Sequence, residues 1–149
     1  MQDTSGVHVW LVMLKAFHAL AVHAQESLRL SQTGLGDSDF RVLEVLLHKG
    51  PLPVNTIGPK VWLTPGSISV AVDRLENRAL VKRTNTDDRR VRLVELTPKG
   101  RALIAKISRE HAAAMEEVAG VLSKEERLML LRLLKKLGKG AEGESISAS

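Results

Sequence analysis

The amino-acid sequence predicts a mostly α-helical (α+β) fold of six helices with a wing sheet of two or three strands. Two helix starts are marked by a threonine followed by a proline, at Thr64-Pro65 and at Thr97-Pro98. Threonine is a good N-cap, and proline at the first helical position loses no hydrogen bond. Residues 91–96 alternate apolar and polar side chains, as a half-buried strand does. The order helix, turn, helix and two strands over residues 57–101 therefore predicts a winged helix-turn-helix.

Three helices are expected within the first 61 residues. Apolar residues recur at helical spacing over residues 7–30, which predicts a long amphipathic helix. A second helix is expected over residues 37–48, because acidic residues begin it and basic residues and Gly50 follow its end. A short third helix is expected over residues 54–61, after a link that two prolines hold extended.

The remaining elements follow from caps and turns. The fourth helix begins after Thr64, and the wing turn is expected over residues 84–88. The fifth helix is expected to run from Pro98 to about residue 118. Ser123 and Glu126 form a capping box for the sixth helix, which we expect to end near residue 137 because a glycine follows. The tail, residues 139–149, is rich in Gly and Ser, which predicts disorder.

The length of the chain predicts a single domain over residues 1–149. Within it, residues 37–101 form the predicted winged-helix lobe. The first helix is longer than one small core requires, and the leucines of the sixth helix spread over more than one face. Both features predict a second subunit, so residues 7–33 and 102–138 are the candidate helical dimerisation region.

The positive charge is concentrated in one segment. Residues 60–101 contain ten Lys/Arg and five Asp/Glu, a net charge of +5, and the net charge of the whole chain is also +5. The rest of the chain therefore sums to zero. A basic surplus confined to one segment is typical of a phosphate-binding surface.

Composition excludes several classes of protein. There is no cysteine, which excludes disulfides and thiolate zinc sites, and the scarcity of aromatic residues argues against a stacking platform for single-stranded nucleic acid. No catalytic pair, metal-ligand spacing or glycine-rich phosphate loop is visible, so we expect neither an enzyme nor a cofactor nor a metal. No signal peptide is visible and no apolar run reaches roughly 18 residues, so a cytoplasmic protein without a membrane span is expected.

The runs LTPGSISVAVDRLENRALVKR and DDRRVRLVELTPKG resemble the MarR family of bacterial transcription regulators. The resemblance is strong over about residues 35–104. The chain departs from the family at Ala79, where glycine is usual, and at Val70, near which a basic or hydrogen-bonding residue is common. An apolar Val70 would suit contact with a thymine methyl group.

The resemblance implies a homodimer whose two lobes bind a palindromic operator in double-stranded DNA, usually to repress transcription. It also implies a pocket between the dimer region and the lobe for a small phenolic or aromatic effector. A patch of rings with a few polar groups suits such a ligand, although the same residues would also serve as ordinary core. The candidate pocket residues are Trp10, Met13, Leu14, Phe17, His18, Phe40 and Leu43.

The fourth helix is the candidate recognition helix, because the N-terminal part of that helix meets base edges in helix-turn-helix proteins. Arg74 lies one turn further along and would either contact DNA or pair with Asp73, Glu76 or Asp88. The resemblance implies that Asp88 braces the wing through an arginine and that Arg90 enters the minor groove. The predicted DNA-binding residues are Thr64, Pro65, Gly66, Ser67, Ser69, Val70, Arg74, Arg83, Arg89 and Arg90.

One alternative function remains open at this point. Winged helices also serve as protein–protein interaction modules, so the fold alone does not decide the partner. The localised positive charge and the arginines of the wing favour DNA.

Overall fold

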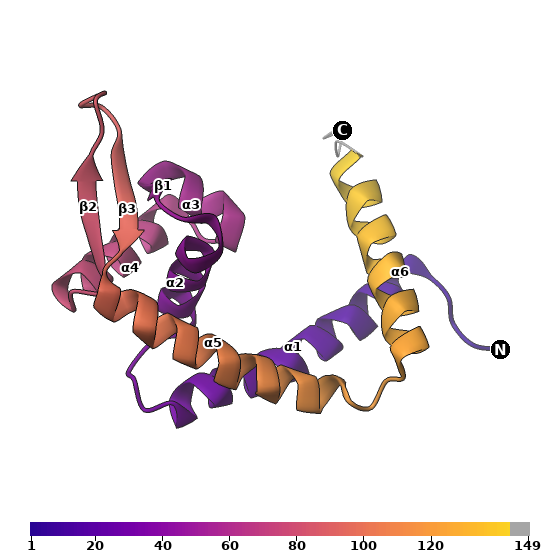
Figure 1. Ribbon diagram of the computed structural model, residues 1–149. Helices are drawn as coiled ribbons and strands as arrows, with labels where there is room; N and C mark the ends of the chain where they lie inside the picture. The colour runs from indigo at the N-terminus through magenta and orange to yellow at the C-terminus, as the bar shows by residue number, and fades with distance from the viewer. Residues whose placement is uncertain (144–149) are drawn as a thin grey trace. The chain divides into compact units, whose positions relative to one another are not determined.

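A computed structural model describes residues 1–143. Its elements are α1 (Gly6–Leu30), α2 (Asp37–Lys49), β1 (Leu52–Pro53), α3 (Val54–Val61), α4 (Pro65–Asn77), β2 (Val81–Asn85), β3 (Arg92–Leu96), α5 (Pro98–Ala119) and α6 (Lys124–Gly143). The six helices and the winged helix-turn-helix predicted from the sequence are confirmed (Figure 1). The described part of the chain divides into two compact units, residues 1–115 and a second that begins at residue 116.

The sheet of the first unit has three antiparallel strands in the order β1-β3-β2. β2 and β3 form the wing hairpin, with Val81 opposite Leu96 and Asn85 opposite Arg92. The two-residue strand β1 pairs with the other edge of β3, where Leu52 lies opposite Val94. Figure 1 shows the hairpin projecting beyond the helices α2, α3 and α4 that surround its base.

The core of the first unit lies between these helices and the sheet. The buried side chains of α4 are Ile68, Ala71, Val72 and Leu75, the four that the helical spacing predicts. They pack in one cluster with buried residues of α2, α3, β2, β3 and α5. The opposite face of α4 is thereby left free.

The helix α1 contributes little to this core. Leu28 is its one buried residue, and its exposed large apolar side chains include Trp10, Leu14 and Phe17. By length and composition α1 could cross a membrane, with a mean hydropathy of 1.4 over its most apolar 18 residues, which corrects the expectation that no such segment exists. One such helix is weak evidence, since the core helix of a soluble protein and a signal sequence pass the same test.

The second unit contains the end of α5 and the helix α6. The capping box predicted for α6 is present, since Glu126 N–H donates to Ser123 Oγ and Ser123 N–H donates to the Glu126 carboxylate. The predicted end of this helix was wrong, because α6 continues through Gly138 to Gly143. Residues 139–143 are therefore helical rather than disordered, and residues 144–149 of the predicted tail lie outside the described residues. α6 buries none of its side chains.

Candidate nucleic-acid interface

The N-terminal end of α4 presents a row of small exposed residues. Thr64 is the N-cap, as predicted, and its Oγ1 accepts a hydrogen bond from Ser67 N–H at 3.2 Å. Pro65 occupies the first turn, where its missing N–H leaves no hydrogen bond unmade. The exposed residues here are Thr64, Pro65, Gly66, Ser67, Ser69 and Val70. The structure thus places these six of the seven predicted contacts of α4 on its solvent face, with the core residues on the other; the seventh, Arg74, is described below.

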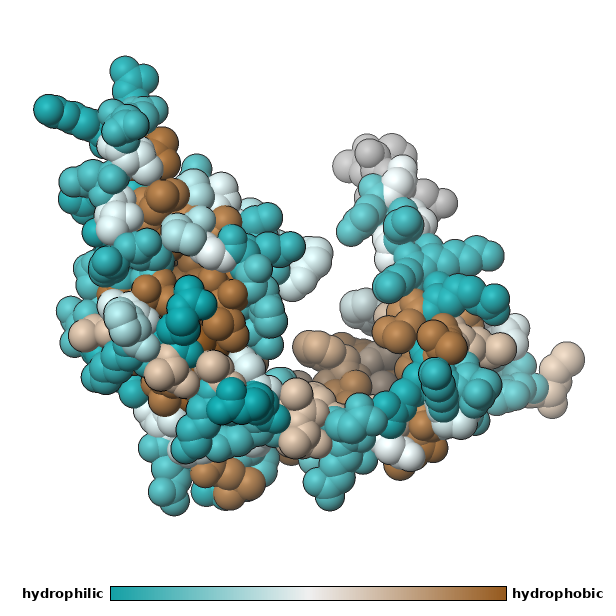
Figure 2. Space-filling view, in the orientation of Figure 1, coloured by the Kyte–Doolittle hydropathy of each residue, from teal (hydrophilic) through white to brown (hydrophobic). Residues whose placement is uncertain are grey.

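The tip of the wing holds two exposed arginines. The Asp88 carboxylate accepts the N–H of Arg90 at 3.0 Å, and the Asp88 carbonyl accepts the N–H of Val91 and the hydroxyl of Thr86. These bonds close a tight turn, so Asp88 braces the wing through a main-chain amide where the family resemblance implied an arginine side chain. Arg89 and Arg90 are exposed and form no ion pair within residues 1–143. Figure 2 shows this tip as hydrophilic.

A third arginine joins the wing to α4. The guanidinium of Arg83, on β2, donates to Asp73 Oδ1 and to Glu76 Oε1, both at 2.7 Å. The hydrogen bond to Asp73 is the largest cause that raises the pKa of Arg83 above its ordinary value. Only 21 % of the Arg83 side chain is exposed. The sequence predicted a DNA contact for Arg83, whereas in the structure its charge is occupied in fixing the wing strand to the recognition helix.

Comparisons with known proteins agree with this geometry. A sequence profile described as the MarR family matches residues 33–91. The HTH-type transcriptional regulator MhqR of Bacillus subtilis is 36% identical over 138 residues, which cover 92% of this chain and 94% of that protein. The chain belongs to the MarR family. Its members are transcriptional regulators and not enzymes, so the expectation of a non-enzymatic, DNA-binding regulator is confirmed.

Other relatives and solved structures extend the comparison. The HTH-type transcriptional repressor MdtR of Bacillus subtilis is 31% identical over 114 residues, covering 76% of this chain and 74% of that protein. A crystal structure of NadR in complex with 4-hydroxyphenylacetate has a TM-score of 0.75 and 25% identity, covering 90% of this chain and 97% of that one. AbsC of Streptomyces coelicolor, at 22% identity and a TM-score of 0.81, supports the fold alone; the match covers 97% of this chain and 99% of that one.

The MarR-family motif LTPKG has a structural role in this chain that the sequence did not reveal. Thr97 Oγ1 donates to the carbonyl of Ala79 at 2.6 Å and accepts the N–H of Gly100, while Thr97 N–H donates to the carbonyl of Leu80. Ala79 has φ +57°, a left-handed conformation that costs an alanine roughly 1 kcal/mol or more. Thr97 therefore holds the strained turn at Ala79 in place and joins α4, the wing and α5 at one point.

Residue 100 must be glycine because there is no space for a side chain beside Leu80. A Cβ atom on Gly100 would lie 1.9 Å from the carbonyl oxygen of Leu80. The first turn of α5 can therefore approach the wing only because residue 100 has no side chain. The spacing between Thr97 and Gly100 in the motif is the signal from which this contact could have been found.

Arg74 has a different partner from any that the sequence suggested. Its guanidinium donates to Asp39 Oδ1, from Nη2 at 2.7 Å and from Nε at 3.2 Å, and makes no ion pair with Asp73, Glu76 or Asp88. Asp39 is buried in α2. The predicted alternatives for local pairing were wrong, since the true partner is 35 residues away in the chain.

The seven candidate pocket residues do not line one cavity in the described chain. Trp10, Leu14 and Phe17 are exposed on α1, whereas Phe40 and Leu43 are buried in the lobe. Phe17 alone of the seven lines a cavity of about 640 Å³. The other residues of that cavity are Arg41, Glu44, Val45, His48, Lys49, Lys60, Val61 and Trp62.

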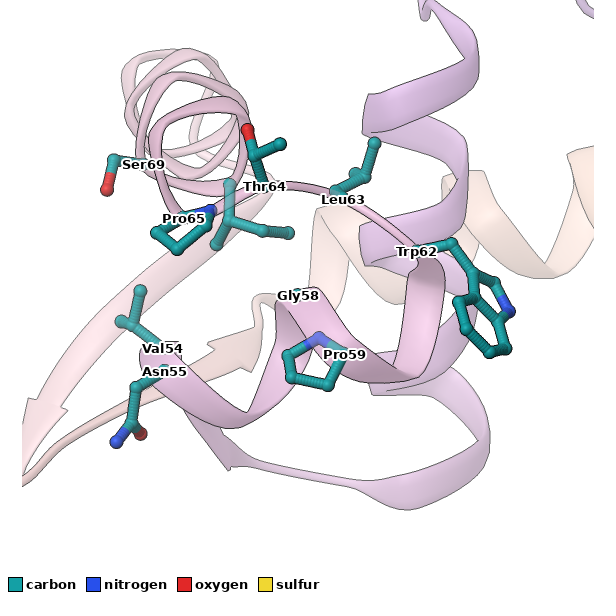
Figure 3. A pocket seen from close by; sticks show the side chains of 10 residues that line it. Val54, Asn55, Gly58, Pro59, Trp62, Leu63, Thr64, Pro65 and Ser69 are labelled. Atoms are coloured by element: carbon teal, nitrogen blue, oxygen red, sulfur yellow. The ribbon is translucent and has the colours of Figure 1, made fainter. Parts of the chain in front are cut away.

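A second cavity lies beside the recognition helix, and sequence reasoning missed it. It has a volume of about 600 Å³ and lies between α3 and the start of α4 (Figure 3). Trp62, which is 83% exposed, stands at one end, and Val54 and Asn55 lie at the other. Trp62 adopts φ +58°, so the helix-turn-helix turn carries a bulky side chain in the left-handed region.

Proposed function

We propose that this MarR-family protein is a homodimeric transcriptional repressor of the cytoplasm that binds a palindromic operator and releases it when a small aromatic ligand binds. The observation that carries the proposal is the pairing of the exposed end of α4 with the exposed wing tip. Arg83 bonds to Asp73 and Glu76, which holds these two surfaces in one rigid arrangement.

The two surfaces suit the two grooves of duplex DNA. Helices of helix-turn-helix proteins contact major-groove base edges with their N-terminal residues, and α4 offers Ser67, Ser69 and Val70 there. The free amides of its first turn would bind a backbone phosphate. Arg90 would enter the minor groove, where a narrow groove concentrates negative potential, and Arg89 would contact phosphate.

The homodimer is supported by the apolar faces that each unit leaves exposed. On α1 they include Val7, Trp10, Leu11, Leu14, Phe17 and Leu20, and on α6 they include Leu128, Leu130, Leu131, Leu133, Leu134 and Leu137. Exposed apolar surface of this extent marks an interaction site. A symmetric dimer would set two recognition helices roughly 34–36 Å apart, one turn of DNA, and so favour a palindrome.

The cavity lined by Phe17 supports an aromatic acid as the effector. It offers the rings of Phe17 and Trp62 together with the cationic side chains of Arg41, Lys49 and Lys60, which outnumber the single carboxylate of Glu44 and suit a flat carboxylate. NadR, whose structure holds 4-hydroxyphenylacetate, is a structural neighbour. Such a ligand would lower operator affinity by favouring a conformation with the wrong spacing of recognition helices.

The experiment is selection of bound fragments from a random duplex pool, followed by binding measurements with the enriched duplex. We expect a palindromic site, a dimer at micromolar concentration by analytical ultracentrifugation, and affinity that falls steeply with salt because phosphate contacts release counterions. Salicylate and 4-hydroxyphenylacetate would then be added at millimolar concentration. Failure to enrich any duplex at low salt would overturn the proposal and favour a protein partner instead.

A paired substitution tests the effector cavity separately. Lys60→Gln removes a cation from the cavity and is expected to weaken the effect of the acid on DNA binding. Lys15→Gln, a charge change on α1 outside the cavity, should leave that effect unchanged. Equal responses of the two variants would contradict the assignment of this cavity.

A further inference from the structure

The guanidinium of Arg78 joins the end of the recognition helix to the loop that connects α1 with α2. Arg78 is the C-cap of α4, and its Nη2 donates to the carbonyl of Thr33 at 2.7 Å. The Arg78 carbonyl accepts a hydrogen bond from Lys99 Nζ at 3.2 Å, and the Arg78 N–H donates to the carbonyl of Arg74 at 3.1 Å. The backbone of Arg78 is therefore fixed in the lobe, and its side chain extends from there to the loop.

The loop that Arg78 contacts has a strained backbone. Gln32 and Gly34, on either side of Thr33, have φ angles of +55° and +71°. A left-handed conformation is unfavourable for glutamine, which has a Cβ atom, and it persists only where the surroundings hold it. Within the loop, Thr33 Oγ1 accepts the N–H of Leu35 at 3.4 Å. The hydrogen bond from Arg78 adds a contact from outside the loop, so the recognition helix helps to hold this strained conformation.

A single buried residue attaches α1 to the core of the lobe. Leu28 is 4% exposed and is the one buried residue of α1. One buried contact near the end of a helix permits the helix to tilt about that contact. α1 has 25 residues, so it is about 37 Å long. A tilt of roughly 10° about Leu28 would move the far end of α1 by about 6 Å, which exceeds the rise of about 3.4 Å between base pairs.

The hydrogen bond between Arg78 and Thr33 opposes this tilt. Thr33 lies beyond the end of α1, so it attaches the chain to the lobe at a second point, separate from Leu28. Two points of attachment resist a rotation that one point permits. The far end of α1 carries Trp10 and other exposed apolar residues, which would contact the second subunit. The angle between α1 and α4 would therefore set the distance between the two recognition helices of a dimer.

We propose that Arg78 is a positioning residue, which fixes α4 relative to α1 and so sets the separation of the two operator half-sites that the dimer accepts. It acts without touching DNA, because it lies at the C-terminal end of α4, whereas Thr64 and Ser67 lie at the N-terminal end that would contact bases. The effect on half-site separation rests on the proposed function. The attachment of α4 to α1 by Arg78 does not, so the two can be tested separately.

Duplexes whose half-sites are moved one base pair closer together or further apart test the effect on DNA binding. We expect the wild type to bind the selected separation about tenfold more tightly than either altered one, and Arg78→Ala to discriminate only about twofold. The slope of log affinity against log salt concentration should stay unchanged, because no phosphate contact is lost. Arg78→Lys keeps the charge and a donor for the Thr33 carbonyl, so it should discriminate as the wild type does. Arg109→Ala, at an exposed position of α5, is the control and should also match the wild type.

The same titrations exclude the two simpler roles of Arg78. A residue that only stabilises the fold would, when replaced, lower affinity equally at every half-site separation. A residue that contacts phosphate would, when replaced, reduce the slope against salt by about one. Either result would overturn the proposal. An equal loss of discrimination in Arg78→Lys and Arg78→Ala would overturn it as well, since the lysine still offers a donor to Thr33.

A distance measurement on the full-length protein without DNA tests the attachment itself. The chain has no cysteine, so Lys15→Cys on α1 and Val70→Cys on α4 place two spin labels at exposed positions. Dilution with unlabelled protein limits the pulsed electron paramagnetic resonance signal to distances within one chain. The distribution of distances should become about twofold wider when Arg78→Ala is added, because α1 can then tilt about Leu28.

Equal widths with and without Arg78→Ala would overturn the attachment, whatever the result with DNA. Adding Arg109→Ala to the labelled protein should leave the distribution unchanged. If selection enriches no duplex, the proposed function fails, while the distance measurement still decides whether Arg78 fixes α4 to α1.

Discussion

The carboxylate of Asp39 in α2 accepts two hydrogen bonds from the guanidinium of Arg74 in α4, at 2.7 and 3.2 Å. The Asp39 side chain is 8% exposed and that of Arg74 is 51% exposed. The pair fixes the recognition helix to the helix behind it. Substituting each partner in turn tests whether Arg74 stabilises the fold, because the two substitutions should lower the free energy of unfolding by different amounts.

Arg74→Gln should lower the free energy of unfolding by about 2 kcal/mol, because it leaves a buried carboxylate with little compensation. Asp39→Asn should cost about 1 kcal/mol, since Arg74 can turn to water. A double-mutant cycle by urea denaturation should show a coupling of roughly 1 kcal/mol. Lys106→Gln, in an exposed pair with Glu110, should stay within about 0.5 kcal/mol. A cycle without coupling would show that the pair does not join the helices.

The wing tip should control affinity without affecting the fold. Arg90→Ala is expected to weaken operator binding by about 10- to 100-fold. It should also reduce the salt slope, meaning the slope of log affinity against log salt concentration, by about one, because one cation beside the phosphates is lost. Fluorescence anisotropy across a range of salt concentrations measures both. Arg109→Ala, at an exposed position of α5, is the matched control. Unchanged affinity of Arg90→Ala would contradict the wing contact.

Arg83 should behave differently from Arg90. Its guanidinium is bonded to Asp73 and Glu76, so Arg83→Ala would release the wing strand from α4. We expect weaker operator binding with an unchanged salt slope, and a loss of about 1 kcal/mol of stability. The same affinity and slope measurements distinguish the two roles. A slope that falls by one in Arg83→Ala would show that this residue contacts phosphate, as the sequence alone predicted.

Ala79→Gly should stabilise the protein. Glycine adopts a positive φ without the clash that Ala79 endures, and the gain, after the loss of chain entropy in the unfolded state, should be about 0.5–1 kcal/mol. Ala102→Gly, at an exposed helical position of α5, should have the opposite sign and cost about 1 kcal/mol. Thermal unfolding of both variants decides the matter, and a destabilised Ala79→Gly would refute the strained turn.

Two glycine-to-alanine substitutions should also differ in sign. Gly100→Ala places a Cβ atom against the carbonyl of Leu80 and should cost roughly 3 kcal/mol or prevent folding. Gly138→Ala meets no atom within 4 Å and lies inside α6, so it should gain up to about 1 kcal/mol. Circular dichroism and thermal unfolding report both. Loss of helix in Gly138→Ala would indicate that the helix ends there, as the sequence predicted.

Local signals allowed most of the fold to be predicted. The caps at Thr64 and Ser123 and the alternation over residues 91–96 each depend on neighbours within a few positions, and the structure confirms them. Gly138 misled the prediction because an isolated glycine weakens a helix by only about 1 kcal/mol and need not end it. The family resemblance located the recognition helix and the wing.

Contacts between distant segments could not be predicted from local sequence signals. Asp39 and Arg74 are far apart in sequence, so spacing arguments offered only nearby carboxylates as partners for Arg74. The clamp between Thr97 and Ala79 has the same origin. The pocket prediction grouped aromatic residues by type, whereas burial separates Phe40 from the exposed rings of α1.

The placement of the two tryptophans offers a practical benefit. Trp62 stands beside the recognition helix, and Trp10 stands on the exposed face of α1, while the chain has no tyrosine to mask their emission. Replacing either one by phenylalanine would leave a single intrinsic chromophore. Operator engagement and subunit exchange could then be followed as separate optical signals in unlabelled protein.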